Sequence, residues 1–223
     1  MSDTPSLAER AAGQPPVRPD QVAVLRWEEE RAAAAVLARA FVDDPLVQAI
    51  CPGPAAERQR RIWWSFRIAV RSHCLARQPA WTIIDHAARP VSLVLVMRPR
   101  TQPEAMSDFL FALRGLWRIG LHAGMRGSQA AQIIAAHAPP QPFTYLRTLG
   151  VDPEWQGRGL GSRLVGWVIQ AAPAAFPVYL ETAKERNLAF YAHHGFTCIG
   201  QFDCLDVPVW RLIRPANVVS CIS

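Results

Sequence analysis

The sequence has few cysteines, and their positions exclude two common kinds of site. The five cysteines are odd in number, scattered along 223 residues, and never spaced as C-x-x-C. A disulfide framework needs paired cysteines, and a zinc site needs closely spaced ligands. They are Cys51, Cys74, Cys198, Cys204 and Cys221. We therefore expect reduced cysteines that pack against their neighbours, and no bound metal.

Long apolar runs and blocks of positive charge are also lacking. No basic-then-apolar segment opens the sequence, and no stretch approaches the ~20 apolar residues of a membrane-spanning helix. The formal net charge is +6, but the cationic residues are spread over several predicted helices and do not interleave with aromatics. The sequence thus predicts a cytoplasmic protein with no membrane or nucleic-acid partner and a mild preference for small anionic ligands.

The chain is long enough, and at 50% hydrophobic residues apolar enough, to bury one full core. Residues 1–20 are rich in proline, alanine and charge, which predicts a disordered tail. We expect a single domain over residues 21–215 and a C-terminal tail over residues 216–223.

Hydrophobic periodicity predicts an alternation of strands and helices. Strands are expected at residues 21–25, 81–85, 91–97, 143–151, 178–180, 199–205 and 209–213. Helices are expected at residues 28–42, 55–77, 101–136 with a break near 124–128, 159–172 and 187–194. The segments 81–85 and 91–97 read as an antiparallel pair. This order indicates an α/β or α+β fold with helices on both faces of the sheet.

The stretch GVDPEWQGRGLGS has three glycines in five residues between a strand and a helix, a general device for holding phosphate. No Lys-Ser or Lys-Thr follows, which excludes a P-loop. A dinucleotide fingerprint fits poorly, because Ser162 stands at the third glycine's position and too few residues remain, although Glu181 lies near the place of the ribose-binding acid. The plain alternative is a tight connection whose glycines only ease packing.

The downstream segment NLAFYAHHGF gives the glycine loop its context. With Val151, Pro153, the loop and Asn187, Tyr191 and Gly195-Phe196 in order, residues 143–196 resemble the GNAT family of N-acetyltransferases. YLRTLGVDPEWQGRGLGS and LETAKERNLAFYAHHGF look most similar to the puromycin N-acetyltransferase-like subgroup, and ARAFVDDPL resembles that group's first helix.

The resemblance implies a GNAT fold, with a mixed, mostly antiparallel sheet splayed between two middle strands, and acetyl-coenzyme A (acetyl-CoA) as cosubstrate. Its pyrophosphate is expected on the backbone N–H groups of the glycine loop, and its pantetheine arm beside the strand that ends at Val151. A backbone N–H near Leu149 matches the oxyanion position. The matching cofactor-binding residues are Leu149, Gly150, Val151, Gln156, Gly157, Arg158, Gly159, Leu160, Gly161, Ser162 and Asn187. For Asn187 a helix N-cap is an alternative role.

Tyr191 matches the family's general acid, and a packing aromatic is the alternative. A general base is needed as well, because a protonated amine must lose its proton before it can attack. The sequence specifies this base less well than the acid. Glu181, at the end of a strand beside the cleft, is the first candidate, and a salt-bridged carboxylate is the alternative. Other candidates are Asp43, Asp44, His137, His193 and His194.

The sequence therefore predicts an N-acetyltransferase that moves an acetyl group to a primary amine of a small molecule by direct attack in a ternary complex. No cysteine lies in the matching motifs, so no covalent acetyl-enzyme is expected. A non-catalytic acyl-CoA sensor or scaffold and an enzyme acting on a protein amine are the alternatives. The sequence leaves it open whether the protein forms a homodimer.

Overall fold

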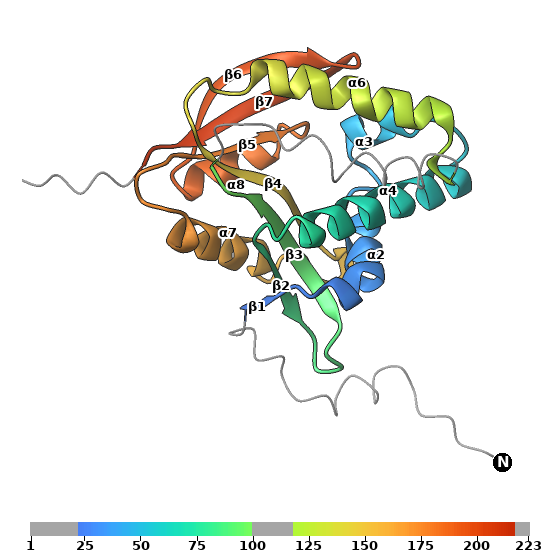
Figure 1. Ribbon diagram of the computed structural model, residues 1–223, viewed down its shortest axis with the longest axis horizontal. Helices are drawn as coiled ribbons and strands as arrows, with labels where there is room; N and C mark the ends of the chain where they lie inside the picture. The colour runs from blue at the N-terminus through green and yellow to red at the C-terminus, as the bar shows by residue number, and fades with distance from the viewer. Residues whose placement is uncertain (1–21, 100–117, 217–223) are drawn as a thin grey trace, which may run out of the picture.

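The computed structural model describes residues 22–99 and 118–216, which form one seven-stranded sheet with helices around it (Figure 1). The strand order is β1-β2-β3-β4-β5-β7-β6. The strands are β1 (Val22–Val24), β2 (Ala80–Ile84), β3 (Pro90–Met97), β4 (Thr144–Val151), β5 (Val178–Thr182), β6 (Thr197–Cys204) and β7 (Val207–Arg214). The helices are η1 (Trp27–Glu29), α2 (Glu30–Ala40), α3 (Pro45–Ile50), α4 (Ala55–Leu75), α6 (Leu121–His137), η2 (Pro153–Trp155), α7 (Leu160–Ala171) and α8 (Asn187–His193).

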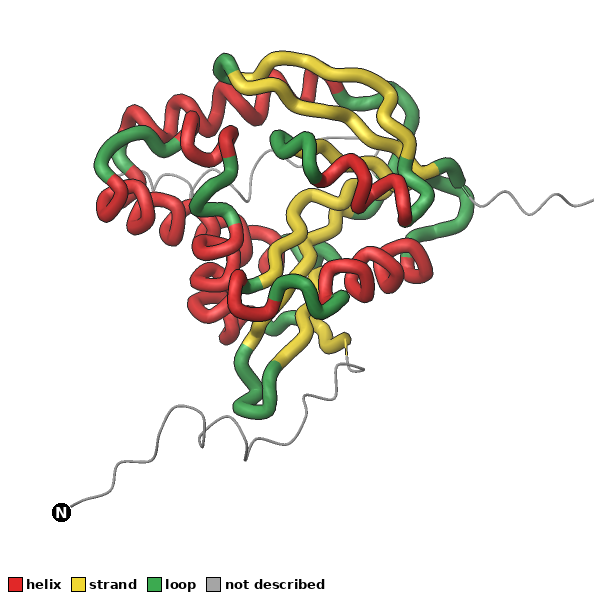
Figure 2. The backbone as a smooth tube through the Cα atoms, turned by 180° about the vertical axis from the view of Figure 1, so that it is seen from behind, coloured by secondary structure: helices red, strands yellow, loops and turns green. Residues whose placement is uncertain are grey.

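The predicted fold class is confirmed, including the splay between two middle strands. Every neighbouring pair of strands is antiparallel except β4 and β5. These two are parallel and pair only through Thr144 with Val178 and Tyr145 with Tyr179. Beyond Tyr145, β4 continues along β3 while β5 continues along β7, so the sheet opens (Figure 2).

The alternation of side chains along β3 explains why helices cover both faces of this part of the sheet. Val94 and Val96 lie in a cluster with α7 residues such as Leu164. Leu93 and Leu95 lie in a second cluster with Val36 and Leu37 of α2. Helices therefore cover both faces of the sheet here, as predicted, and β3 is buried on both sides.

Two details of the predicted helices differ in the structure. The helix predicted at residues 28–42 ends as α2 at Ala40, and the short helix α3 that follows it was not predicted. Asp44 is the N-cap of α3 and accepts hydrogen bonds from the N–H groups of Leu46 and Val47. Asp at an N-cap followed by Pro is a helix-start signal, which the sequence did carry. The expected break at residues 124–128 is absent, because α6 runs through Gly124 and Gly127.

Packing explains the continuity of α6. Two glycines cost a helix about 2 kcal/mol relative to alanine, but tertiary contacts override such a propensity. Ala123 and Ala130 are buried on either side, and a Cβ at Gly127 would lie 3.6 Å from Ile50 of α3. The remainder of that predicted helix, residues 101–117, and the two predicted tails lie outside the described residues apart from residue 216. Among the described helices, none is both long and apolar enough to cross a bilayer.

Candidate functional site

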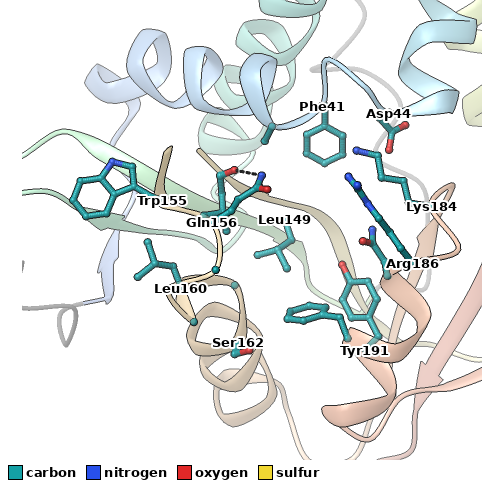
Figure 3. Close-up of a pocket in the computed structure, with 18 residues that line it drawn as sticks. Phe41, Asp44, Leu149, Trp155, Gln156, Leu160, Ser162, Lys184, Arg186 and Tyr191 are labelled. Atoms are coloured by element: carbon teal, nitrogen blue, oxygen red, sulfur yellow. Dashed lines mark hydrogen bonds between the residues drawn. The ribbon is translucent and has the colours of Figure 1, made fainter. Parts of the chain in front are cut away.

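The opening between β4 and β5 holds a pocket of about 430 Å³ beside the glycine loop. One wall is the end of β4, a second is the loop with the first turn of α7, and a third is α8 with the connection from β5. Figure 3 shows Trp155, Gln156, Leu160 and Ser162 at one side, and Asp44, Lys184 and Arg186 gathered on the other. The lining is Ala40, Phe41, Asp44, Leu149, Gly150, Val151, Trp155, Gln156, Gly157, Gly159, Leu160, Gly161, Ser162, Lys184, Arg186, Asn187, Phe190 and Tyr191. We call it the donor pocket.

The loop presents its backbone to the pocket because two glycines adopt left-handed conformations. Gly157 and Gly159 have φ of 74° and 76°, and a Cβ at either would meet no atom within 4 Å. These glycines are therefore needed for backbone geometry, and the space over them is open. Gly159 is the N-cap of α7 and provides no side-chain cap, so N–H groups in the first turn of this helix have no intrahelical partner.

Neighbouring side chains hold the loop in place. Asp152 accepts from the N–H of Glu154 and pairs with Arg39 of α2, whose Nε donates to Oδ2 at 3.0 Å. Gln156 donates from Nε2 to the carbonyl oxygen of Val151 at 3.1 Å, so its side chain serves the loop itself.

Arg158 alone among the predicted cofactor-binding residues does not line the donor pocket. Its guanidinium lies 4.7 Å over the Trp155 ring and donates to the carbonyl of Glu154. The other ten predicted residues are brought together there. Packing explains the glycine at position 150, since a Cβ there would lie 2.5 Å from Cδ2 of Leu37 in α2.

Two cations line the donor pocket that sequence reasoning missed. Lys184 is the only lysine in the sequence, and Arg186 follows it in the connection between β5 and α8. Together with the N-terminus of α7 they make the pocket suited to an anion. Their position in the sequence, between the two predicted site residues Glu181 and Asn187, could have indicated that they lie at the pocket.

Tyr191 lies at the inner end of the donor pocket and is 7% exposed. Its ring packs against Phe190 and Phe196, with centroids 5.0 and 5.7 Å away. Burial raises the pKa of its hydroxyl well above the usual value, so the phenol holds its proton at neutral pH. Packing and proton donation are therefore compatible in this residue.

Asn187 is the first residue of α8 and not its N-cap, which is Arg186. Its Nδ2 donates to Oγ1 of Thr182 at 3.0 Å, tying α8 to the end of β5.

A second pocket, of about 690 Å³, lies on the other side of the opening. We call it the acceptor chamber. Five residues line both cavities: Phe41, Asp44, Leu149, Asn187 and Tyr191. The two cavities therefore meet beside these five residues, Tyr191 among them. The acceptor chamber is formed by α3, α6 and residues of both middle strands, with Phe41 and Phe66.

Glu181 lines the acceptor chamber but not the donor pocket. Burial raises the pKa of this carboxyl to about 6, although Tyr145, Tyr179 and the cation of Arg211 lower it in part. Such a carboxylate is ionised at pH 7 and is a stronger base than an exposed glutamate. Glu181 forms none of the salt bridges found among the described residues.

Of the remaining acid–base candidates, only Asp44 lies where the two cavities meet. Asp43 is exposed, while Asp44 is buried as the cap of α3 and lines both cavities. Burial raises the pKa of Asp44, and the N–H of Val47 and the cation of Lys184 oppose that rise. His137, His193 and His194 line neither cavity. Within the described ranges, no group of three or more potential ligands could hold a metal ion.

Part of the chain is similar to known acetyltransferases. Residues 119–198 match the family model described as an acetyltransferase (GNAT) domain. N-alpha-acetyltransferase RimI of Mycobacterium tuberculosis is 44% identical over 62 residues, and an uncharacterized protein of Mycobacterium leprae is 42% identical over 67 residues. These matches cover 26% and 29% of this chain, and only 39% and 18% of those proteins.

Solved structures share the fold over most of the chain. An acetyltransferase structure from Corynebacterium glutamicum, described as histone acetyltransferase HPA2 and related acetyltransferase, superposes with a TM-score of 0.70 at 22% identity, covering 88% of this chain and 96% of that one. Arylalkylamine N-acetyltransferase 2 of Aedes aegypti superposes with a TM-score of 0.56 at 12% identity, covering 88% and 98%. These structures confirm the fold, and the family model over residues 119–198 bears out the resemblance to the GNAT family.

Proposed function

We propose that the chain transfers the acetyl group of acetyl-CoA to a primary amine of a small molecule; residues 119–198 match the model of an acetyltransferase (GNAT) domain. The observation that carries the proposal is the meeting of two cavities of different character beside Tyr191. The donor pocket offers the backbone of the glycine loop and two cations, and the acceptor chamber is lined largely by apolar side chains. The subgroup similar to puromycin N-acetyltransferases stays a prediction.

The residues of the donor pocket fit coenzyme A. A pyrophosphate needs several donors at close range, and the open space over Gly157 and Gly159 gives access to the uncapped N–H groups that begin α7. Lys184 and Arg186 add positive charge. The diverging end of β4, at Leu149 and Val151, would pair with the amide groups of the pantetheine arm, since β5 does not pair with it there.

Acetyl-CoA supplies an activated thioester, and the residues at the junction supply proton transfers. We assign Glu181 to accept the proton of the incoming ammonium, directly or through one water, which frees the nitrogen lone pair. As the C–N bond forms and the C–S bond breaks, Tyr191 donates its proton to the departing sulfur. The backbone N–H at Leu149, which lines both cavities, is the proposed donor to the carbonyl oxygen.

Direct transfer is favoured over a covalent acetyl-enzyme. Four cysteines lie in the described part of the chain, and none of these four lines either cavity. No described thiol is thus available at the junction as an intermediate carrier.

The test is release of free coenzyme A from acetyl-CoA in the presence of a panel of primary amines, puromycin included. Turnover with at least one amine is expected. Tyr191→Phe should lower kcat by about 10–100-fold and leave coenzyme A affinity unchanged, because the ring that packs the core is kept. An unchanged kcat would remove the proton-donor role, and tight coenzyme A binding without turnover of any amine would favour the sensor alternative.

A further inference from the structure

One face of α6 forms a smooth apolar wall along the acceptor chamber. The residues of this wall recur at the three- and four-residue spacing of a single helix face. They are Gly127, Ala130, Ala131, Ile134, Ala135 and the C-cap residue Ala138. At 1.5 Å per residue the wall is about 16 Å long, and all but one of its side chains are no larger than methyl.

Bulky apolar side chains border the chamber beside this wall. Leu46, Val47 and Ile50 come from α3, and Leu46 and Ile50 pack with Ala130 of α6 in one cluster. Phe41 and Phe66 line the chamber as well. The chamber has a volume of about 690 Å³, which falls in the range of pockets that enclose drug-sized ligands. The small residues of α6 leave the space that larger side chains would have filled.

The polar groups of the chamber are concentrated on the middle strands and the segments that flank α3 and α8. They are Asp44, Tyr145, Arg147, Thr148, Tyr179, Glu181, Thr182 and Asn187. Tyr179 is fully buried, and it lies beside Glu181 on the polar side of the chamber. The chamber therefore has one polar side, which carries the two carboxyl groups of Asp44 and Glu181, and one apolar side.

Resting on the proposed function, we propose that the acceptor is a primary amine that carries a bulky, flat apolar body, such as an arylalkylamine. The ammonium group would lie by Glu181 and Asp44, and the aromatic body would lie against the apolar surface that α6 and α3 present to the chamber. A polyamine or an amino sugar fits less well, because its polar groups would be buried against walls that offer no hydrogen bonds.

The first measurement is kcat/KM for amines that differ only in the body: butylamine, phenethylamine, tryptamine and, as a polar comparison, spermidine. We expect kcat/KM to rise by about 10–100-fold from butylamine to tryptamine, as burial of an aromatic group predicts. A flat series, or a preference for spermidine or for a peptide amine, would overturn the proposal while the acetyltransferase function stands.

A matched pair of variants on α6 localises the effect. Ala131 is exposed to the chamber, and Ala136 is exposed but does not line it. Ala131→Leu should lower kcat/KM for tryptamine by about 10-fold or more through loss of space and leave butylamine nearly unchanged. Ala136→Leu should leave both amines unchanged. An equal loss for both amines in the first variant, or none, would contradict the assignment.

Calorimetric titration of tryptamine into the coenzyme A-loaded protein separates this proposal from the proposed function. Binding to the wild type that weakens in the Ala131→Leu variant supports the chamber even if no amine is acetylated. Absence of tryptamine binding to a protein that acetylates butylamine refutes the chamber alone.

Discussion

Tyr191 at the junction of the cavities and Glu181 in the acceptor chamber have surroundings that suit opposite proton transfers. Burial raises the pKa of Tyr191, which keeps a proton available to a leaving thiolate. Burial raises the pKa of Glu181 to about 6, which makes it more basic than usual while it is still ionised at neutral pH. Pairs of titratable groups with separated pKa values are typical of acid–base sites.

The pKa of Glu181 predicts the acidic limb of the pH profile. Because the base must be ionised, kcat/KM for the amine should fall tenfold per pH unit below about 6 and level off above it. Glu181→Gln should remove this limb and lower kcat/KM by about 100-fold or more. Glu185→Gln, on the exposed connection to α8, is the control and should retain the wild-type profile. A limb that persists in Glu181→Gln would assign the base elsewhere.

Gly159 tests the phosphate assignment of the loop. Asp and Asn have similar size and both tolerate the left-handed backbone that this position requires. Gly159→Asp should weaken coenzyme A binding at least 10-fold more than Gly159→Asn, because a negative charge would face the phosphates. Calorimetry with coenzyme A measures the difference, and equal affinities of the two variants would argue against phosphate at this position.

At the level of elements, α2 packs directly on the part of β4 that borders the donor pocket. Gly150 lies against Leu37, and Arg39 pairs with Asp152 at the start of the loop. The same helix ends beside Phe41, which lines both cavities. The position of α2 therefore affects the shape of both.

Gly150→Ala should destabilise the protein by about 1–3 kcal/mol, since the new Cβ would lie 2.5 Å from the fully buried Leu37 side chain. Gly166→Ala in α7 is the control: a Cβ there meets nothing within 4 Å, and alanine favours the helix by about 0.5–1 kcal/mol. Chemical denaturation of both variants gives the two free energies of unfolding. Equal stability of the two would show that α2 moves aside without cost.

At the level of the whole molecule, the two halves of the sheet are joined by few backbone pairs. Between β4 and β5 only two residue pairs are in register, although the strands themselves are longer. A cosubstrate in the opening would contact the loop, β4 and α8 together. It would therefore link parts of the fold that the sheet leaves separate.

Coenzyme A should accordingly stabilise the folded protein and protect specific amides. At about 100 times its dissociation constant, the free energy of unfolding should rise by about 2.7 kcal/mol, which a thermal melt detects as a higher Tm. Hydrogen exchange should slow chiefly at residues 146–151 and 159–162. Protection confined to β6 and β7 would place the ligand away from the opening, and the Gly159→Asp variant should show a reduced shift in Tm.

The sequence by itself predicted the alternation of strands and helices and the glycine loop, because these depend on local signals. Tyr191 as the acid and Glu181 as the base stay predictions. A left-handed glycine, a free helix N–H and a strand before a helix are properties of contiguous residues, so Gly157, Gly159 and the start of α7 could be read directly. Only the tertiary structure decided the acceptor chamber. Its walls come from α3, α6, β4 and β5, and no local pattern tells that Ala131 faces a cavity or that Tyr179 lies beside Glu181. Such a cavity arises from how distant elements pack, and in the sequence its small residues look the same as those of any helix.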